Sequence, residues 1–344
     1  MTDSEEVPPV ARKRGRFVIA AIAGLLGCLL LAWWWLHSVQ ADLDALRRHI
    51  KTEPYGPSWL HEVGGGLLDP ALQRIVSIRL FEQRIEPELV SRFSGMTDVR
   101  RVDLSRSNNV DLMMPLVGEA RQLRKLQLIR SDISDEGFAH VSGLTELEEI
   151  ELSETDLTDA AFAHLQGLHA LTKLRARKAY VGDEGLQYLA ELPRLKILDL
   201  SRTDVRDEGL QYLAELPQLY WLRLSRTNVG DDGMQYLSEL PKLEVLKLSR
   251  TNVSETGLRH IARLSSLKHL DIDGSKVTAS ALAELRSMET LESLALDGTQ
   301  VTNDSIVHLA AMPALTTLVL RRPAVDQATF ERLSKALPHC KLSF

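Results

Sequence analysis

The stretch SRTNVGDDGMQYLSELPKLEVLKLSRTNV, from Ser225 to Val253, begins and ends with the same five letters. The two copies lie twenty-four residues apart, and Leu222 and Leu246 occupy matching places in front of them. The same period carried in both directions gives an unbroken column of aliphatic residues: Ile78, Val102, Leu126, Ile150, Leu174, Leu198, Leu222, Leu246, Leu270, Leu294 and Leu318. Repetition at a fixed period of this length predicts a stack of similar structural units.

Two more aliphatic columns run beside the first, one from Ile75 to Leu315 and one from Leu80 to Leu320. Together they form the pattern L-x-x-L-x-L, whose alternating end is typical of a short strand with one buried face. The rest of each unit indicates a short helix. In 203–219, for example, Leu210, Leu213 and Leu216 recur at helical spacing, and Pro217 ends the run.

An acidic column precedes these helices, and we expect its members to be N-caps. Asp207 is the example, because a carboxylate can accept hydrogen bonds from the free N–H groups of the first turn. The equivalent residues are Asp135, Asp159, Asp183, Asp231 and Asn303. A single strand–turn–helix unit cannot bury its own apolar face, so stacked units should form a parallel sheet on one side and helices on the other.

The recurring T-x-V-x-D-x-G-L-x-x-L sequence pattern resembles the leucine-rich repeat family, over about Arg74 to Phe344. The nearest groups are bacterial repeats akin to the ribonuclease-inhibitor and F-box-associated types. The resemblance implies an α/β solenoid of about eleven repeats of 24 residues, with a parallel sheet on the concave side, short helices on the convex side, and partners bound on the concave face. The family often has Asn or Cys after the strand, where this chain has hydroxyl residues that can bond the local backbone: Thr155, Thr203, Thr227, Thr251, Thr299, Ser107, Ser131 and Ser275.

The amino-terminal part has a different character, and we divide the chain into a short basic segment (1–16), an apolar segment (17–36), a linker and cap (37–73) and the repeats (74–344). Residues 17–36 contain no charge and would span about 30 Å as a helix, enough to cross a bilayer. The basic flank predicts a cytoplasmic amino terminus and a periplasmic or extracellular repeat domain; it comprises Arg12, Lys13, Arg14 and Arg16. Two alternatives stay open: a lipoprotein acylated on Cys28, and a cleaved secretory signal.

Composition and motifs argue against several functional classes. The net charge of −6 does not suggest nucleic-acid binding, and the two cysteines, Cys28 and Cys340, predict no disulfide framework. We find no motif for catalysis, for a metal or for a cofactor, so an enzyme is the least favoured class. One column holds His140, His164, His260 and His308, but Tyr188, Tyr212 and Tyr236 fill it in the middle copies. We therefore interpret it as a partly exposed structural ladder on the helical side.

The outward residues of the strands supply the candidate binding site. Ile197, Trp221 and Val245 share one column, flanked by Asp199, Arg223 and Lys247. An exposed Trp between aliphatic residues and framed by charges resembles an interface hot spot. A second, charged patch consists of Lys173, Arg175, Arg177 and Lys178, which Glu149, Glu151 and Glu154 of the preceding copy should offset.

A ladder of basic residues follows the strands, with members Arg202, Arg226, Arg250, Arg106, Arg130 and Lys178. The ladder could bind a phosphate or a carboxylate group of a ligand. It could instead be a solvent-exposed edge whose charges are balanced by acidic neighbours, and the presence of those neighbours favours this second interpretation. The sequence thus predicts a membrane-anchored repeat protein that binds a protein or an envelope ligand. The alternative from another class is a structural envelope component that packs against its own copies. A cytosolic adaptor is disfavoured by the apolar segment.

Overall fold

The computed structural model describes residues 49–54, 73–95, 97–278, 280–300, 302–320 and 326–343. The predicted basic segment, the apolar segment with Cys28 and most of the predicted linker lie outside these residues. Within the described ranges, no helix has the length and apolar character needed to cross a bilayer. The chain divides into two compact units, Met1–Val76 and Ser77–Phe344, and the second unit contains all but the start of the predicted repeat region.

The predicted parallel sheet is confirmed. From β2 onward each strand pairs in parallel with the next strand in the sequence, with a shift of one repeat per strand. Leu222, for example, is paired with Leu198 on one side and Leu246 on the other. The strands are β1 (Ile50–Pro54), β2 (Gln73–Arg79), β3 (Arg101–Asp103), β4 (Lys125–Gln127), β5 (Glu149–Glu151), β6 (Lys173–Arg175), β7 (Ile197–Asp199), β8 (Trp221–Arg223), β9 (Val245–Lys247), β10 (His269–Asp271), β11 (Ser293–Ala295), β12 (Thr317–Val319) and β13 (Lys341–Ser343).

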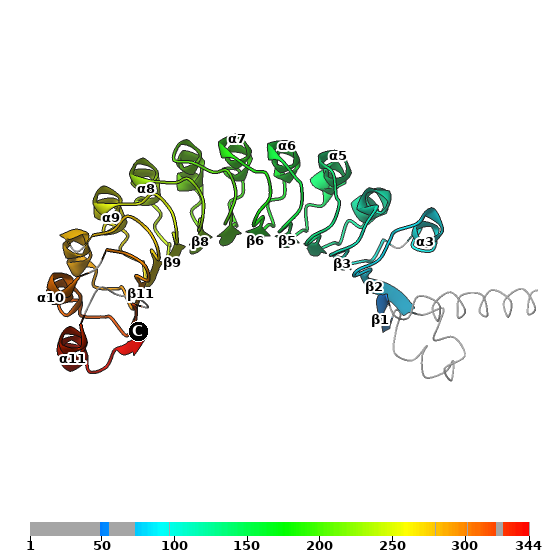
Figure 1. Ribbon diagram of the computed structural model, residues 1–344. Coiled ribbons are helices and arrows are strands. Elements are labelled where there is room, and N and C mark those ends of the chain that lie inside the picture. Colours follow the sequence, from blue (N-terminus) through cyan, green and yellow to red (C-terminus); the bar gives the residue numbers. More distant parts are fainter. Residues whose placement is uncertain are drawn as a thin grey trace, which may run out of the picture. The chain divides into compact units, whose positions relative to one another are not determined.

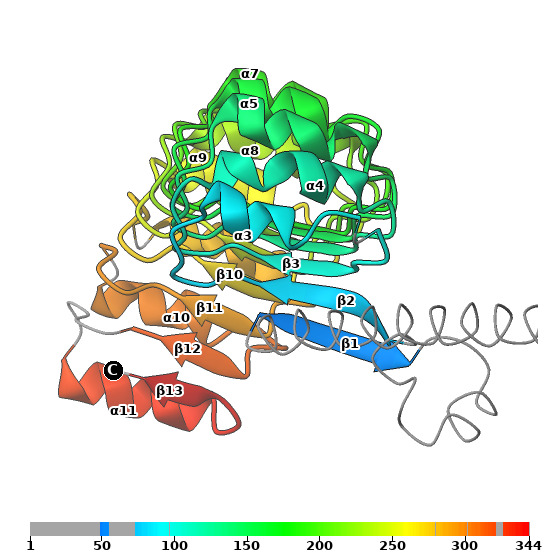
Figure 2. The same cartoon turned by 90° about the vertical axis from the view of Figure 1, so that its right-hand side faces the viewer.

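The core lies between the sheet and the helices. The middle column is buried from Ile78 to Leu318, and the flanking columns are buried from Val99 to Leu315 and from Leu80 to Leu320. Each repeat therefore buries the same leucine positions against the next repeat, as a solenoid requires. In the second unit the strands line the inner side of an arc and the helices its outer side (Figures 1 and 2).

The helices are short, and many of them are 3-10 helices. The α-helices are α3 (Pro87–Ser91), α4 (Met114–Glu119), α5 (Asp135–Phe138), α6 (Asp159–Phe162), α7 (Asp183–Leu186), α8 (Asp231–Leu237), α9 (Glu255–Ile261), α10 (Ile306–Leu309) and α11 (Gln327–Ala336). The 3-10 helices are η1 (Val110–Leu112), η2 (Ala139–Gly143), η3 (Ala163–Leu165), η4 (Gln187–Leu189), η5 (Glu208–Glu215), η6 (Ser280–Ser287) and η7 (Asn303–Ser305). The helix predicted within 203–219 is thus η5. The spacing of Leu210, Leu213 and Leu216 suits this form, because a 3-10 helix has three residues per turn.

The prediction that the aspartate column caps the helices of its own repeats is wrong. Asp207 makes no cap hydrogen bond with its side chain, and Asp135 and Asp231 already lie within the first turn of α5 and α8. The carboxylates instead reach one repeat further along the chain. Asp207 accepts a hydrogen bond from the backbone N–H of Gly230 (2.6 Å), and Asp231 accepts from those of Ser254 (2.7 Å) and Gly257 (2.9 Å).

The same contacts explain why a glycine recurs in the D-x-G pattern of the repeats. A Cβ atom on Gly233 would lie 2.5 Å from Asp207 Oδ1, and one on Gly257 would lie 2.5 Å from Asp231 Oδ1. Glycine therefore leaves space for the carboxylate of the preceding repeat. Burial raises the pKa of Asp207, against the backbone N–H groups of Gly230 and Gly233, which favour its charged form.

The turn after each strand is closed by the predicted hydroxyl residues. Thr203 Oγ1 donates to the carbonyl of Leu200 (2.6 Å), and Thr227 and Thr251 bond Leu224 and Leu248 in the same way. The residue just before each hydroxyl adopts a left-handed backbone. Its φ is 60° at Arg202, 61° at Arg226 and 58° at Arg250. The basic ladder thus occupies a tight turn at the carboxyl ends of the strands.

Candidate functional site

The sheet register brings three apolar residues of the candidate site together. Ile197 pairs with Trp221, and Trp221 pairs with Val245, on β7, β8 and β9. All three are half-buried, and the Lys247 ammonium lies 6.0 Å from the centre of the Trp221 ring. We call Ile197, Trp221 and Val245 the apolar stripe.

The apolar stripe follows a charged part of the same column. The preceding strands, from β3 to β6, place charged side chains in the same register, namely Arg101, Lys125, Glu149 and Lys173. The stripe is therefore the place where this column changes from charged to apolar. Its predicted role in ligand binding stays a prediction.

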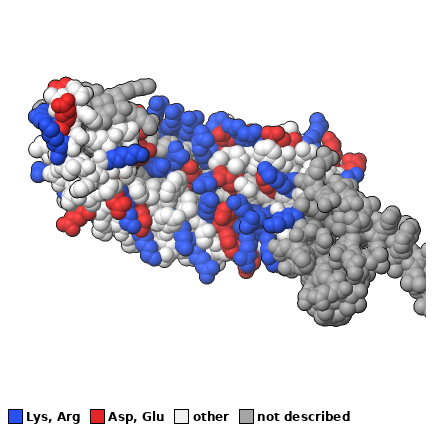
Figure 3. All heavy atoms as spheres, turned by 90° about the horizontal axis from the view of Figure 1, so that it is seen from below, with Lys and Arg blue, Asp and Glu red and all other residues white. Residues whose placement is uncertain are grey.

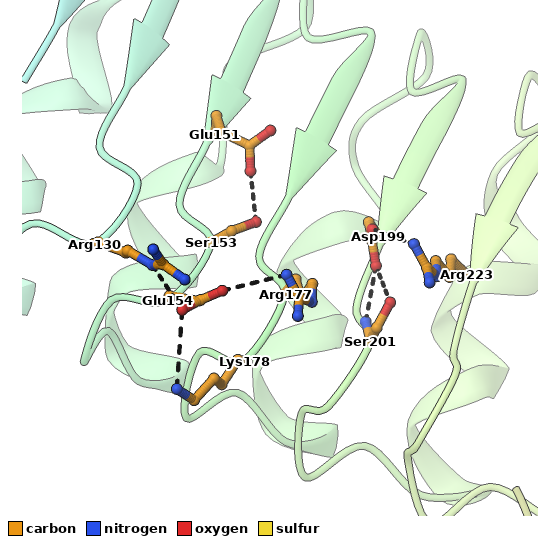
Figure 4. Close-up of polar contacts among 9 residues, drawn as sticks. All are labelled: Arg130, Glu151, Ser153, Glu154, Arg177, Lys178, Asp199, Ser201 and Arg223. Atoms are coloured by element: carbon orange, nitrogen blue, oxygen red, sulfur yellow. Dashed lines mark hydrogen bonds and ion pairs between the residues drawn. The ribbon is translucent and has the colours of Figure 1, made fainter. Parts of the chain in front are cut away.

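Asp199, which was predicted to contact a ligand, stabilises a turn of the chain instead. Asp199 is only 5% exposed, and its Oδ1 accepts hydrogen bonds from the backbone N–H of Ser201 (3.0 Å) and from the Ser201 hydroxyl. Its other oxygen lies 3.9 Å from the guanidinium of Arg223 (Figure 4). The expectation that Asp199 is exposed is thus corrected, because its carboxylate is used to hold the turn after β7.

The predicted charged patch is neutralised by its neighbours, as expected. Glu154 lies 2.9 Å from Arg130, 3.2 Å from Arg177 and 4.0 Å from Lys178 (Figure 4). On the strands, Lys173 lies 3.5 Å from Glu149, and Arg175 lies 3.4 Å from Glu151. The basic residues of β6 and its turn therefore carry little uncompensated charge.

These pairs also shift the pKa values of the acids. The hydrogen bond from Arg130, with smaller contributions from Arg177 and Lys178, holds the pKa of Glu154 below its usual value. Burial raises the pKa of Glu149, but hydrogen bonds and charges from Lys125 and Lys173 outweigh it, and the resulting pKa is low. Both carboxylates are stabilised in their ionised form.

The basic ladder behaves differently at its two ends. Arg106 lies 2.8 Å from Glu82, and Arg130 is bonded to Glu154. Further along, Arg202, Arg226 and Arg250 are exposed, and in the described part of the chain no acidic side chain forms an ion pair with them. Figure 3 shows the molecule from below, on the side of the strands. A group of Lys and Arg side chains lies along one long edge of this view, next to a stretch in which acidic and basic side chains alternate.

These three arginines border a groove of about 860 Å³ at the carboxyl ends of the strands. Its other charged lining residues are Arg177, Arg223, Asp273 and Asp297, and Ser225 also lines it. Neither Ser225 nor Asp297 was predicted as a site residue from the sequence. The sequence did contain a signal for Ser225. The matching positions two residues before it and one repeat further on are both basic, Arg223 and Lys247, whereas Ser201 has Asp199 and Ser249 has Asp271.

The His and Tyr column lies on the helical side and is partly exposed, as predicted. Tyr188, Tyr212, Tyr236 and His260 are all half-buried. Among the described residues, no three His, Cys, Asp or Glu side chains lie together in a way that would hold a metal ion.

The repeats match known sequence families. Residues 217–277 match one leucine-rich repeat family model, and residues 192–214 match a second. No curated protein sequence matches the chain. The two family matches identify leucine-rich repeats within residues 192–277, and the same strand register continues through the neighbouring repeats.

Solved structures share this architecture. An internalin (inlF) from Listeria monocytogenes is similar, with a TM-score of 0.52 and 17% identity over 84% of this chain and 95% of that one. The leucine-rich repeat ectodomain of the membrane receptor kinase GASSHO1/SCHENGEN3 from Arabidopsis thaliana, in complex with CASPARIAN STRIP INTEGRITY FACTOR 2, is also similar. Its TM-score is 0.51 with 14% identity, over 80% of this chain and 39% of that ectodomain. At these identities the likeness is one of fold.

Proposed function

We propose that this leucine-rich repeat chain is a membrane-anchored binding protein whose concave sheet holds a protein or envelope partner through the apolar stripe. Leucine-rich repeat proteins generally mediate protein–protein binding, and the Arabidopsis ectodomain with this fold was solved in complex with a factor. The observation that carries the proposal is the register of Ile197, Trp221 and Val245 on β7, β8 and β9. Three adjacent apolar side chains on a largely charged face lose contact with water when a partner covers them.

Trp221 would be the anchor of this interface. Its ring is large and rigid and has an apolar neighbour on each side, and Lys247 and Arg223 on the flanking column supply a charged rim. Buried tryptophans surrounded by such a rim commonly carry much of the binding free energy. The membrane anchor rests on the uncharged segment 17–36 and its basic flank.

Site-specific crosslinking in cells tests the proposal. A photo-crosslinking amino acid at Val245 should capture one defined partner, whereas the same amino acid at Tyr188 on the helical side should not. Trp221→Ala should then weaken the affinity for that partner at least about tenfold, which is about 1.4 kcal/mol, without lowering the melting temperature.

Four results would count against the proposal. Equal capture from both positions would mean that the partner does not use the concave face. An unchanged affinity of Trp221→Ala would place the interface elsewhere. A sharp fall in the melting temperature of this variant would show that Trp221 is a packing residue. Capture of a second copy of the chain would favour the structural envelope component instead.

A further inference from the structure

The groove beside Arg202, Arg226 and Arg250 holds like charges that the fold does not demand. Each of these arginines has a left-handed backbone, a conformation that glycine adopts most readily. In the next two repeats the same position is in fact glycine, at Gly274 and Gly298, with φ of 63° and 68°. The turn therefore forms without an arginine, and the side chains need another explanation.

The arginines of the groove repel one another. Neighbouring strands are about 4.8 Å apart, so guanidinium groups on successive turns lie close together. The charges of Arg250 and Arg202 lower the pKa of Arg226. Elsewhere in the ladder an acid relieves this repulsion, as Glu82 does for Arg106 and Glu154 does for Arg130. The groove has carboxylates only toward its other end, at Asp273 and Asp297, and among the described residues neither forms an ion pair with the three arginines. A bound anion would relieve the repulsion between the arginines.

The groove also contains buried polar atoms that lack partners. Ser225 is only 5% exposed, and its Oγ has no hydrogen-bond partner among the described residues. Three equivalent hydroxyls have acidic partners, because Ser201 donates to Asp199 and Ser249 donates to Asp271 (2.6 Å), as Ser153 does to Glu151. Ser105 Oγ, far from the groove on the turn after β3, is likewise unpaired in the described part of the chain, although Asp103 lies within reach of its backbone N–H. On β8 the matching acid is replaced by Arg223, whose buried Nε likewise lacks a partner within the described ranges. Both Ser225 and Arg223 can donate hydrogen bonds into the groove.

We infer that this groove binds the phosphate group of a larger ligand, held by Arg202, Arg226, Arg250, Arg223 and Ser225. A phosphate accepts several charged hydrogen bonds at once, and guanidinium groups match its oxygens in pairs. At the other end of the groove, Asp297 Oδ1 is buried, and no residue that the structure describes donates a hydrogen bond to it. It lies about three strand spacings from Arg226, or about 14 Å.

This second end indicates what the rest of the ligand is like. A carboxylate accepts hydrogen bonds, so the part of the ligand that faces Asp297 should carry hydroxyl groups. A phosphate ester of a sugar or polyol has both features. A strongly acidic peptide has only the first, and Asp297 would repel it. The groove shares Arg223 with the rim of the apolar stripe, but none of the three stripe residues lines it. The Trp221 and Arg226 variants therefore test the two proposals independently.

Calorimetric titration of the full chain in a non-ionic detergent tests the inference. The probes are pyrophosphate, glycerol 3-phosphate, the diester glycerophosphoglycerol and, as a carboxylate, succinate. At least one phosphate should bind saturably, with a Kd below about 1 mM in about 0.1 M salt, where weak surface attraction is screened. Tighter binding of the diester would identify a lipid or polymer headgroup as the source, and tighter binding of the monoester would identify a soluble phosphorylated compound.

Matched variants separate a specific site from general charge. Arg226→Gln should weaken phosphate binding at least about tenfold, whereas Arg106→Gln removes the same charge from a paired position of the ladder and should change it less than about twofold. Arg226→Gly should abolish binding while the melting temperature stays the same or rises, because glycine suits the left-handed turn.

Other results would overturn the inference. One is the absence of saturable binding for every phosphate probe. Another is an equal loss of affinity in Arg226→Gln and Arg106→Gln. Tighter binding of succinate than of any phosphate would identify the groove as a contact for acidic side chains of a protein.

Discussion

Single residues of the middle column hold the repeats together. Leu222 has no exposed surface and is paired with Leu198 and Leu246 on the adjoining strands. Leu222→Ala should lower the free energy of unfolding by about 2–5 kcal/mol, because it leaves a cavity between packed repeats. Chemical denaturation followed by circular dichroism measures this.

Arg226→Ala is the control for Leu222→Ala, since Arg226 is exposed and lies beyond the end of β8. Arg226→Ala should change the free energy of unfolding by no more than about 0.5 kcal/mol. Similar losses in the two variants would mean that the buried and exposed faces are assigned wrongly.

The ionisation of Glu154 should make the free energy of unfolding depend on pH. Its low pKa arises from the hydrogen bond of Arg130 and the charges of Arg177 and Lys178. Because its pKa in the folded state is below that in the unfolded state, the stabilisation is present above the unfolded value near 4.5 and is lost as the pH falls through the folded value.

Glu154→Gln should therefore be less stable than the parent at pH 7, and the difference should shrink as the pH is lowered below about 4.5. Denaturant midpoints measured at several pH values between about 7 and 3 would show it. Glu239→Gln, at an exposed position after α8, is the control and should follow the parent curve. A constant difference between Glu154→Gln and the parent at all pH values would contradict the expectation.

The strands and helices themselves are too short to be stable alone, and the contacts between successive repeats fix them in place. Most strands have three residues, and α5, α6 and α7 have four. Isolated helices of this length do not form in water. The contact of Asp231 with Ser254 and Gly257 is one example of a link from one repeat to the next.

Gly257→Ala tests that link. The new Cβ would lie 2.5 Å from Asp231 Oδ1 and 2.9 Å from Val253 Cγ1, so these atoms must move, at a cost of about 1–3 kcal/mol. In an Asp231→Ala background the same change should cost at least about 0.5 kcal/mol less, which a double-mutant cycle measures.

Gly182→Ala is the matched control for Gly257→Ala. Its φ is −117°, and an added Cβ meets no atom closer than 3.5 Å, so its effect should be small. Full additivity of Asp231→Ala and Gly257→Ala would show that the carboxylate and the glycine are not coupled.

At the scale of the whole molecule, the proposed anchor determines where the repeats meet their partner. If the basic flank stays in the cytoplasm, protease added to the opposite face of the membrane should digest the repeats. Immunoblotting against the carboxy terminus would follow the loss, and a cytoplasmic protein that stays intact would control for leakage.

Digestion of the repeats only from the cytoplasmic face would reverse this topology. Fatty-acid labelling that disappears in Cys28→Ser would identify the lipoprotein in place of the membrane-spanning anchor, with the repeats on the same side. An amino terminus that starts beyond residue 36 in the mature protein would identify a cleaved signal.

The sequence alone determined the repeat architecture. The period of twenty-four residues and the leucine columns predicted the strands, the parallel order and the buried face, because stacking equal units is how such short elements bury their leucines. It also placed Ile197, Trp221 and Val245 side by side, since one repeat is one strand spacing. The hydroxyl column was predicted from the same reasoning, because its bonds to the backbone are local.

Only the tertiary structure decided where the acidic side chains go. Asp207 looked like an N-cap in the sequence, but its carboxylate reaches the next repeat, and Asp199 turned out to be buried in its own turn. Arg106 and Arg226 occupy the same repeat position, yet of the two only Arg106 has an acid within reach in the described part of the chain. A periodic sequence specifies the backbone of every repeat alike, whereas pairing depends on which side chains meet across two neighbouring repeats in space.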